Sequence, residues 1–144
     1  MALKIGPRLT SLLENKQLVV VATTAKDGTA RMVPVWYDYA DGYIRLNGGQ
    51  NAAGKNRVWL TRLAETKQAT LLFLDPQNFF RWATIRGRVV DVSTDLGGNH
   101  INQLSHRYGG QDYQGPREGR TTVRIEIESV AGAENQKPWD VENS

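Results

Sequence analysis

Short segments in which apolar residues alternate with polar ones, or run without interruption, recur along the chain and predict β-strands. Residues 18–24, LVVVATT, form a β-branched run typical of a strand buried on both faces. Residues 43–47 and 121–128 alternate between apolar and polar positions, as half-buried strands do. Three further segments of strand composition cover residues 30–39, 68–74 and 79–93. The pattern therefore predicts six strands.

Turn-forming residues connect these strands and restrict two of them. Asp-Gly pairs within residues 25–29 and 40–42 favour tight turns, so we expect the first three strands to form an antiparallel meander. Pro34 interrupts the second strand. Because proline has no N–H to donate, this position requires a sheet edge, a bulge or a missing partner. Gly87 predicts a bend or bulge in the long strand at 79–93.

Three segments carry apolar residues at the spacing of an amphipathic helix. They cover residues 6–15, residues 52–65 and residues 95–108. No βαβ unit repeats, so we expect a mainly β (α+β) fold: a six-stranded antiparallel split β-barrel with about three short helices. We assign residues 1–133 to a single domain and residues 134–144 to a polar C-terminal tail.

Composition narrows the classes of function. With 144 residues and 40% hydrophobic content, the chain can bury the core of one domain. Its net charge of +3 is a mild excess without a dense basic run, so we expect no nucleic-acid partner. No segment has the roughly 20 apolar residues that span a bilayer, and the first residues do not resemble a signal peptide. We therefore expect no membrane span and a cytoplasmic location.

Side chains that could carry catalysis by themselves are scarce. The chain has no Cys, which excludes thiolate chemistry, and two His are too few for a structural zinc site. His100 and His106 share one predicted helix and are interpreted as surface residues. Turn chemistry accounts for Asp41, which leaves Asp38 as a lone acid. We assign no catalytic residue and no metal ligand, and we expect chemistry carried by a cofactor.

Residues 47–57, NGGQNAAGKNR, combine features of an anion-binding loop. They leave an apolar strand, cross a Gly-Gly loop and enter the predicted helix. Gly48 and Gly49 let the backbone approach a ligand closely, and the first turn of a helix presents unpaired N–H groups. Lys55 and Arg57 add two cations. The combination suits a phosphate group, and the alternative is a polar loop before an ordinary helix, with solvated cations.

Three motifs resemble a known family. The strand pair DG-x-x-R-x-x-PVW-x-DY, the loop and helix with Lys55 and Arg57, and the later pair LDP…RGRVV closely resemble the split β-barrels of the pyridoxamine 5'-phosphate oxidase-like family. More narrowly, they resemble its deazaflavin-dependent branch, oxidoreductases that use coenzyme F420 in place of FMN. The resemblance covers about residues 9–130. The segment RVWLTRLAETKQAT departs from the family pattern, because it is longer and lacks the usual Asp-Pro.

The resemblance implies a cofactor groove at a homodimer interface. The resemblance implies four roles for the site residues. Some are expected to contact the ring system, some to shape the loop, some to hold the phosphate by charge-assisted hydrogen bonds, and some to complete the groove from either subunit. The expected ring contacts are Val33, Pro34, Val35 and Trp36; the loop residues are Asn47, Gly48 and Gly49; the phosphate ligands are Lys55, Asn56 and Arg57; and the residues that complete the groove are Trp82 and Arg86.

The function that the resemblance implies is hydride transfer. A reduced deazaflavin, F420H2, would pass a hydride to a small unsaturated or quinone-like acceptor, with no protein nucleophile required. One alternative is an FMN-dependent oxidoreductase on the same fold. Another is a non-catalytic protein that binds a flavin, a deazaflavin or a tetrapyrrole.

Overall fold

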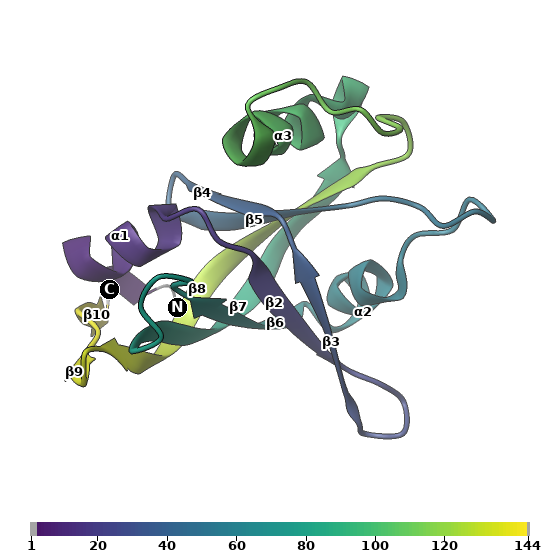
Figure 1. Ribbon diagram of the computed structural model, residues 1–144. Coiled ribbons are helices and arrows are strands. Elements are labelled where there is room, and N and C mark those ends of the chain that lie inside the picture. The colour runs from purple at the N-terminus through teal and green to yellow at the C-terminus, as the bar shows by residue number, and fades with distance from the viewer. Residues whose placement is uncertain (1–2, 144) are drawn as a thin grey trace.

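The main element of the fold is an antiparallel sheet of eight strands that curls into a half-barrel (Figure 1). The computed structural model describes residues 3–143. The strand order is β3-β2-β6-β7-β8-β5-β4, and β9 pairs with β8. The strands of this sheet are β2 (Val19–Thr24), β3 (Ala30–Val35), β4 (Tyr37–Ala40), β5 (Tyr43–Gly48), β6 (Gln68–Leu74), β7 (Arg81–Thr94), β8 (Thr121–Glu134) and β9 (Lys137–Pro138). A separate pair joins β1 (Leu3–Ile5) to β10 (Val141–Asn143). The predicted antiparallel fold is confirmed, with more strands than the six predicted.

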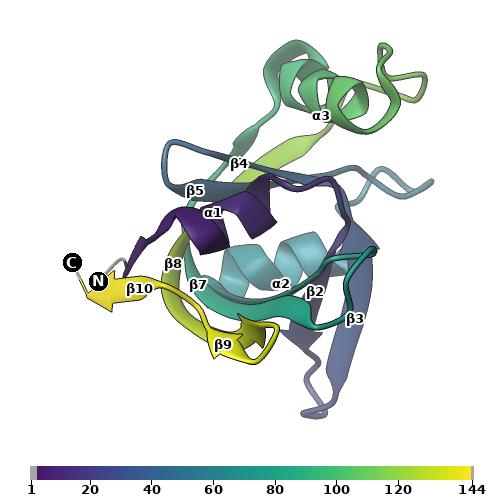
Figure 2. The same cartoon turned by 60° about the vertical axis from the view of Figure 1, so that its left-hand side comes forward.

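Two helices cover the hollow of the curled sheet and a third lies outside it. Helices α1 (Pro7–Glu14) and α2 (Val58–Thr66) contribute leucines to the same buried core as the inward-facing side chains of the strands. Helix α3 (Asn99–Gly109) follows a short 3-10 turn, η1 (Leu96–Gly98), and stands beyond the β4–β5 end of the sheet (Figure 2). The three helices match the number predicted from the apolar spacing.

The strand predicted over residues 30–39 is wrong, because it breaks at Trp36 into β3 and β4. These two strands are consecutive in the chain but form opposite edges of the sheet. Strand β3 pairs with β2 alone among the described residues, so Pro34 lies on an edge strand as predicted. The predicted irregularity at Gly87 is also confirmed, since the β7–β8 register shifts between Arg86 and Gly87.

The helix predicted from residue 52 begins only at Val58. Residues before it form a turn in which Asn51 N–H donates to the carbonyl of Lys55 (2.7 Å). The side chain of Asn51 also accepts the N–H of Lys55 (3.1 Å), and Gly54 has φ 75°. An Asn side chain that binds nearby N–H groups competes with helix formation, so Lys55 lies in a loop and not in a first helical turn.

The C-terminal segment is part of the folded structure. Trp139 is buried, and its indole Nε1 donates to the carbonyl of Trp82 (2.7 Å). The Asp140 carboxylate accepts the N–H groups of Arg8 (2.9 Å) and Leu9 (3.0 Å) at the start of α1. The residue that precedes α1 is Gly6, which has no side chain to accept these N–H groups. Asp140 therefore caps the helix from the far end of the chain.

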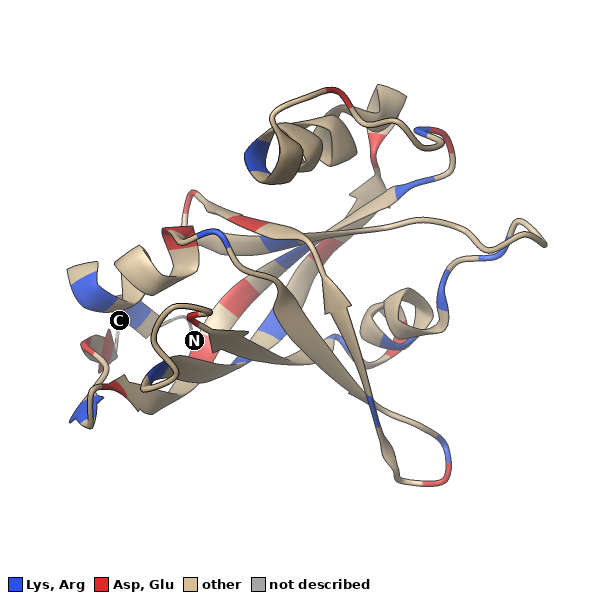
Figure 3. Cartoon of the chain, in the orientation of Figure 1, with Lys and Arg blue, Asp and Glu red and all other residues tan. Residues whose placement is uncertain are grey.

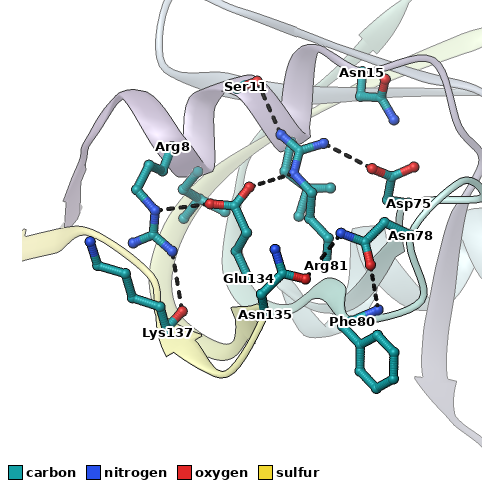
Figure 4. Close-up of polar contacts among 12 residues, drawn as sticks. Arg8, Ser11, Asn15, Asp75, Asn78, Phe80, Arg81, Glu134, Asn135 and Lys137 are labelled. Carbon is teal, nitrogen blue, oxygen red and sulfur yellow. Dashed lines mark hydrogen bonds and ion pairs between the residues drawn. The ribbon is translucent and has the colours of Figure 1, made fainter.

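A chain of ion pairs joins the same regions (Figure 4). Glu134, at the end of β8, accepts Nε of Arg8 (3.0 Å) with one oxygen and Nε of Arg81 (2.9 Å) with the other. Arg81 also reaches Asp75 Oδ2 (3.1 Å) and donates to Ser11 Oγ (3.0 Å). The hydrogen bond from Arg8 holds the pKa of the Glu134 carboxyl below its ordinary value. Helix α1 is thereby fastened to the end of the β7–β8 pair at which Arg81 lies opposite Glu134.

We expect Asp140→Ala to lower the free energy of unfolding by about 1–2 kcal/mol at neutral pH, the usual effect of losing a helix cap. Burial alone would raise the pKa of Asp140, but the N–H groups of Arg8 and Leu9 outweigh it and the pKa lies below its ordinary value. A depressed pKa stabilises the fold above the unfolded-state pKa, so the difference from wild type should shrink below about pH 4. Urea unfolding across pH measures it.

The exposed Glu142 in the same segment provides the matched control, and Glu142→Ala should leave stability within about 0.5 kcal/mol of wild type. An Asp140→Ala variant as stable as this control would show that the cap is unimportant.

Candidate functional site

A groove runs between the edge strand β3 and helix α2. It consists of three adjoining hollows, which we call the hairpin hollow, the strand hollow and the inner chamber, with volumes of about 680, 370 and 360 Å³. Val58 and Arg62 border the first two, and Arg57 and Trp59 border the last two. We call the three together the β3–α2 groove. Figure 3 shows Lys and Arg on β3 and on the segment that leads into α2.

The three hollows differ in their lining. The hairpin hollow has both signs of charge, with Lys26 and Arg62 opposite Asp27 and Glu65. The strand hollow has three arginines and no acid. The inner chamber is aromatic and cationic, and it too has no acid. The strand hollow is lined by Thr23, Arg31, Met32, Val33, Arg57, Val58, Trp59 and Arg62, and the inner chamber by Val35, Trp36, Asn47, Gly48, Gly49, Arg57, Trp59, Ile101, Tyr113 and Arg120.

Gly48 and Gly49 allow close packing at the floor of the inner chamber. A Cβ on Gly48 would lie 2.8 Å from Leu60 Cδ2 and 3.1 Å from the Trp59 ring, and one on Gly49 would lie 2.8 Å from Arg120 Nη1. These glycines were predicted to let the backbone approach a ligand; in the structure the space left by their missing side chains is taken by helix α2 and an arginine. Neither requires a positive φ.

Asn47 holds that arginine in place. The side-chain oxygen of Asn47 accepts Nε of Arg120 (2.7 Å), and Arg120 Nη1 donates to the Tyr113 hydroxyl (3.4 Å). The Arg120 guanidinium also lies over the Tyr113 ring, 5.2 Å from its centroid. Asn47 was predicted to shape the loop at a cofactor site; in the structure its side chain fixes Arg120 in the chamber wall.

The amide nitrogen of Asn47 faces the opposite way, into a buried polar network. It donates to Asp95 Oδ2 (3.0 Å) and lies 3.2 Å from His100 Nδ1. Asp95 in turn accepts the N–H groups of His100 (2.8 Å) and Ile101 (3.0 Å), so it caps helix α3. Burial would raise the pKa of Asp95, but these donors lower it overall. The network connects strand β5, under the chamber, to helix α3 above it.

The surface position predicted for His100 is wrong. His100 is buried, 2.9 Å from Thr122 Oγ1 through Nδ1 and 3.3 Å from Asp38 Oδ1 through Nε2. Asp38 has basic partners on two sides, because it also accepts Nε of Arg45 (2.8 Å). Burial would raise the pKa of Asp38, but its bonds to His100 and Arg45 lower it overall. His106, by contrast, is exposed as expected.

Aromatic side chains form the outer wall of the inner chamber. Trp36, at the break between β3 and β4, stacks on Tyr108 of α3 with ring centroids 5.1 Å apart and an interplanar angle of 6°. Tyr113 meets Trp36 edge-on at 6.3 Å. Burial raises the pKa of the Tyr108 hydroxyl, which donates to the carbonyl of Gln17 (2.6 Å). The wall is held by α3 and the loop after it.

The structure brings most of the predicted site residues together, and four of them lie elsewhere. Val33 lines the strand hollow; Val35, Trp36, Asn47, Gly48 and Gly49 line the inner chamber; Arg57 lines both, and Asn56 lines the hairpin hollow. Pro34 and Lys55 are exposed and line none of these hollows, while Trp82 and Arg86 lie on β7, where Arg86 donates to Ser129 Oγ (3.0 Å).

Several groove residues were not predicted from the sequence. Arg31 shares a strand face with Val33 two residues later, and Val58 and Arg62 share a helix face, so their spacing could have indicated them. Tyr113 and Arg120 come from the Gly/Pro-rich loop before β8, where no periodicity exists to indicate them.

Two further observations concern the described residues 3–143. No helix there is long and apolar enough to cross a membrane. Within the same range, no group of three or more His, Cys, Asp or Glu is placed to hold a metal ion.

We expect Gly48→Ala to lower the free energy of unfolding by about 1–3 kcal/mol, because the added Cβ would force α2 away from β5. Gly109→Ala is the matched control, since a Cβ there meets nothing within 4 Å and its φ is not positive. Thermal and urea unfolding of the two variants compare them directly. Equal stability in both would contradict the tight packing at Gly48.

Several known protein structures have a similar fold. Among solved structures, an F420 reductase has TM-score 0.74 and 23% identity, over 84% of this chain and 94% of that chain. HupZ from Group A Streptococcus has TM-score 0.63 and 14% identity, over 95% and 98% of the two chains. A conserved hypothetical protein from Mycobacterium tuberculosis has TM-score 0.65 and 16% identity, over 96% and 87%. At these identities the likeness is one of fold.

None of the curated proteins compared with the chain matches it. The sequence model of a family described as pyridoxamine 5'-phosphate oxidase, however, matches residues 5–133. This range includes every element that forms the β3–α2 groove and nearly all of the half-barrel around it. The resemblance predicted from the sequence motifs is therefore confirmed, and the chain belongs to the pyridoxamine 5'-phosphate oxidase family.

Proposed function

We propose that the protein is an oxidoreductase that binds reduced deazaflavin F420H2 in the β3–α2 groove and serves hydride transfer to a small unsaturated or quinone-like acceptor. The observation that carries the proposal is the polarity of the groove. The strand hollow in the middle of the groove presents arginines without acids, and it adjoins an aromatic chamber at one end. A ligand with an anionic group and a planar ring matches this arrangement.

The ring end of such a cofactor fits the edge strand. Because β3 pairs only with β2 among the described strands, the other edge of its backbone is available to the polar rim of a ring. Val33 and Val35 face the groove and supply an apolar surface. Pro34 lies between them and points away, exposed. The alternation favours contacts from the backbone of β3 over contacts from polar side chains.

The anionic end fits the strand and hairpin hollows. Arg57, Arg31 and Arg62 converge on the strand hollow and can bind a phosphate by charge-assisted hydrogen bonds. The groove continues past Arg62 into the hairpin hollow, where both signs of charge are present. That extra length suits the longer tail of the deazaflavin, with Lys26 and Arg62 as the cations for its anionic groups. Lys55 and Asn56 precede Arg57 in the same loop and complete the proposed phosphate site.

The bound cofactor would supply a hydride, and the acceptor would take it up together with a proton from solvent. The residues of the chain bind the cofactor and the acceptor, orient them toward each other and exclude water. Trp36, Trp59 and Tyr113 enclose the chamber where an acceptor would meet the ring. The Tyr113 hydroxyl, bonded to Arg120, can hold a proton there. No described side chain needs to act as a nucleophile.

The proposal includes a homodimer. The outer face of β6 and β7 exposes Leu72, Leu74 and Trp82, which lie on neighbouring strands with Leu74 opposite Trp82. Phe79 and Phe80 extend this face at the turn between the two strands and are over two-thirds exposed. A contiguous apolar face of this kind suits a second copy of the chain. Trp82 and Arg86 would then complete a groove from the partner subunit.

We expect Arg57→Ala to weaken cofactor binding by about 1.5–3 kcal/mol if the guanidinium bonds a phosphate. Lys55→Ala should also weaken binding, but by less, because Lys55 is exposed and lines none of the hollows. Fluorescence titration of the apoprotein with F420 and with FMN measures both. Arg88→Ala is the control, since Arg88 lies on β7 and pairs with Glu126 at 3.5 Å, outside the groove.

Unchanged affinity in Arg57→Ala would reject the phosphate assignment. Tight FMN binding without F420 binding would replace the deazaflavin with a flavin. Binding of either cofactor without oxidation of its reduced form by a panel of quinones and enones would reject the oxidoreductase and favour a carrier protein.

We expect Trp82→Glu to convert the dimer to monomer, or to raise its dissociation constant by at least about tenfold, because a desolvated carboxylate opposes association. Sedimentation velocity at several concentrations measures the change. Leu96→Glu is the matched control, since Leu96 is exposed on η1, away from this face. A monomeric wild type, or a Trp82→Glu dimer as tight as the control, would reject the interface.

A further inference from the structure

The inner chamber contains a cation, Arg120, that is not among the residues assigned to the phosphate. We propose that Arg120 makes the chamber selective for planar acceptors that carry an anionic group, such as a carboxylate on an aromatic or quinone ring. This inference rests on the proposed function, because it concerns the second ligand of the same groove. It names a substrate class and the residue that selects it.

No acidic side chain between residues 3 and 143 forms an ion pair with the guanidinium of Arg120. Its Nε and Nη1 donate to the neutral oxygens of Asn47 and Tyr113, and its Nη2 donates to no described residue. No Asp or Glu lines the chamber. The nearest acid in the network, Asp95, already accepts Asn47, His100 and Ile101. A half-buried arginine with a free donor and no carboxylate partner favours an anionic ligand.

Arg120 is also fixed before a ligand arrives. Asn47 holds its Nε at 2.7 Å, Tyr113 stacks beneath its plane, and the missing side chain of Gly49 leaves room for Nη1. Asn47 is in turn anchored by Asp95. Since the donor fork is already ordered, an anion that binds it loses little free energy to side-chain ordering.

The rest of the chamber favours a flat ligand of limited size. Its walls are the rings of Trp36, Trp59 and Tyr113. Its volume of about 360 Å³ is at the small end of ligand pockets, which suits one or two fused rings. Trp36 cannot easily move away, because it is stacked on Tyr108.

Arg120 is separate from the cations assigned to the phosphate. Arg31 and Arg62 line the strand hollow and Arg120 lines the inner chamber, with Arg57 and Trp59 between the two. A cofactor whose anionic tail lies along the strand hollow leaves Arg120 for the acceptor. Cofactor binding and acceptor selectivity should therefore depend on different arginines.

The test compares an anion with its neutral isostere. Calorimetric titration of the protein, without cofactor and loaded with it, uses 2-naphthoate and 2-naphthamide as probes. We expect wild type to bind the acid at least about tenfold more tightly than the amide, the effect of one charge-assisted hydrogen-bonded pair. The preference should disappear in Arg120→Gln and persist in Arg88→Gln. The wild-type comparison stands even if a variant folds poorly.

Equal affinity of wild type for acid and amide would overturn the inference, and so would a preference that survives Arg120→Gln. A separate cofactor titration distinguishes it from the proposed function. Arg120→Gln should bind the cofactor within about twofold of wild type, since single-site effects that touch no contact are small. A large loss there would assign Arg120 to the cofactor and overturn the inference alone, whereas failure of wild type to bind F420 or FMN would overturn the proposed function.

Discussion

The amide side chain of Asn47 is the interaction on which the candidate site depends. Its nitrogen faces inward to Asp95 and lies beside His100 and Thr122, while its oxygen faces outward to Arg120. One residue at the end of β5 thus positions helix α3, which supplies the roof of the chamber, and the arginine in its wall. A buried amide with all of these partners satisfied gives a unique arrangement, because each alternative leaves a polar group unpaired.

The position of the groove follows from the way in which the sheet is interrupted at Trp36. Strands β3 and β4 are adjacent in the chain but lie at opposite edges of the sheet, so the segment between them crosses the open side of the half-barrel. The aromatic ring at the crossing is held against α3. Helix α2 fills the remaining opening and brings Arg57 and Trp59 beside β3. The groove therefore lies where the edge strands β3 and β4, the break at Trp36 and the start of helix α2 come together.

The sequence predicts the strands well and the site in part, for physical reasons. Alternation and β-branched runs are local properties, so β2 and β6 were found nearly to the residue. The break at Trp36 was missed because residues on both sides keep the strand pattern, and only tertiary pairing separates them. The start of α2 was displaced by the side chain of Asn51, which outcompetes helix formation. The burial of His100 depends on Asp38 and Thr122, which are distant in the chain.

The site residues that no pattern indicated share one origin. Tyr113 and Arg120 belong to an irregular loop whose position is set by its contacts with Asn47 and Trp36 and not by its own composition. The cations in regular elements, such as Arg31 and Arg62, repeat with the period of their strand or helix and could have been read from it. Irregular segments have no such period, so their function becomes visible only with the fold.

The cap on helix α1 has a consequence for how the chain folds as it is made. Asp140 is separated by 132 residues from the Arg8 N–H that it binds, and Glu134 by 126 residues from the Arg8 side chain. On the ribosome, where N-terminal segments emerge first, α1 is synthesised well before Asp140 and gains its cap only after the residues between them have been released. Contacts between such distant residues slow folding, because a long loop must close before they form. The contacts that secure helix α1 therefore form late in folding.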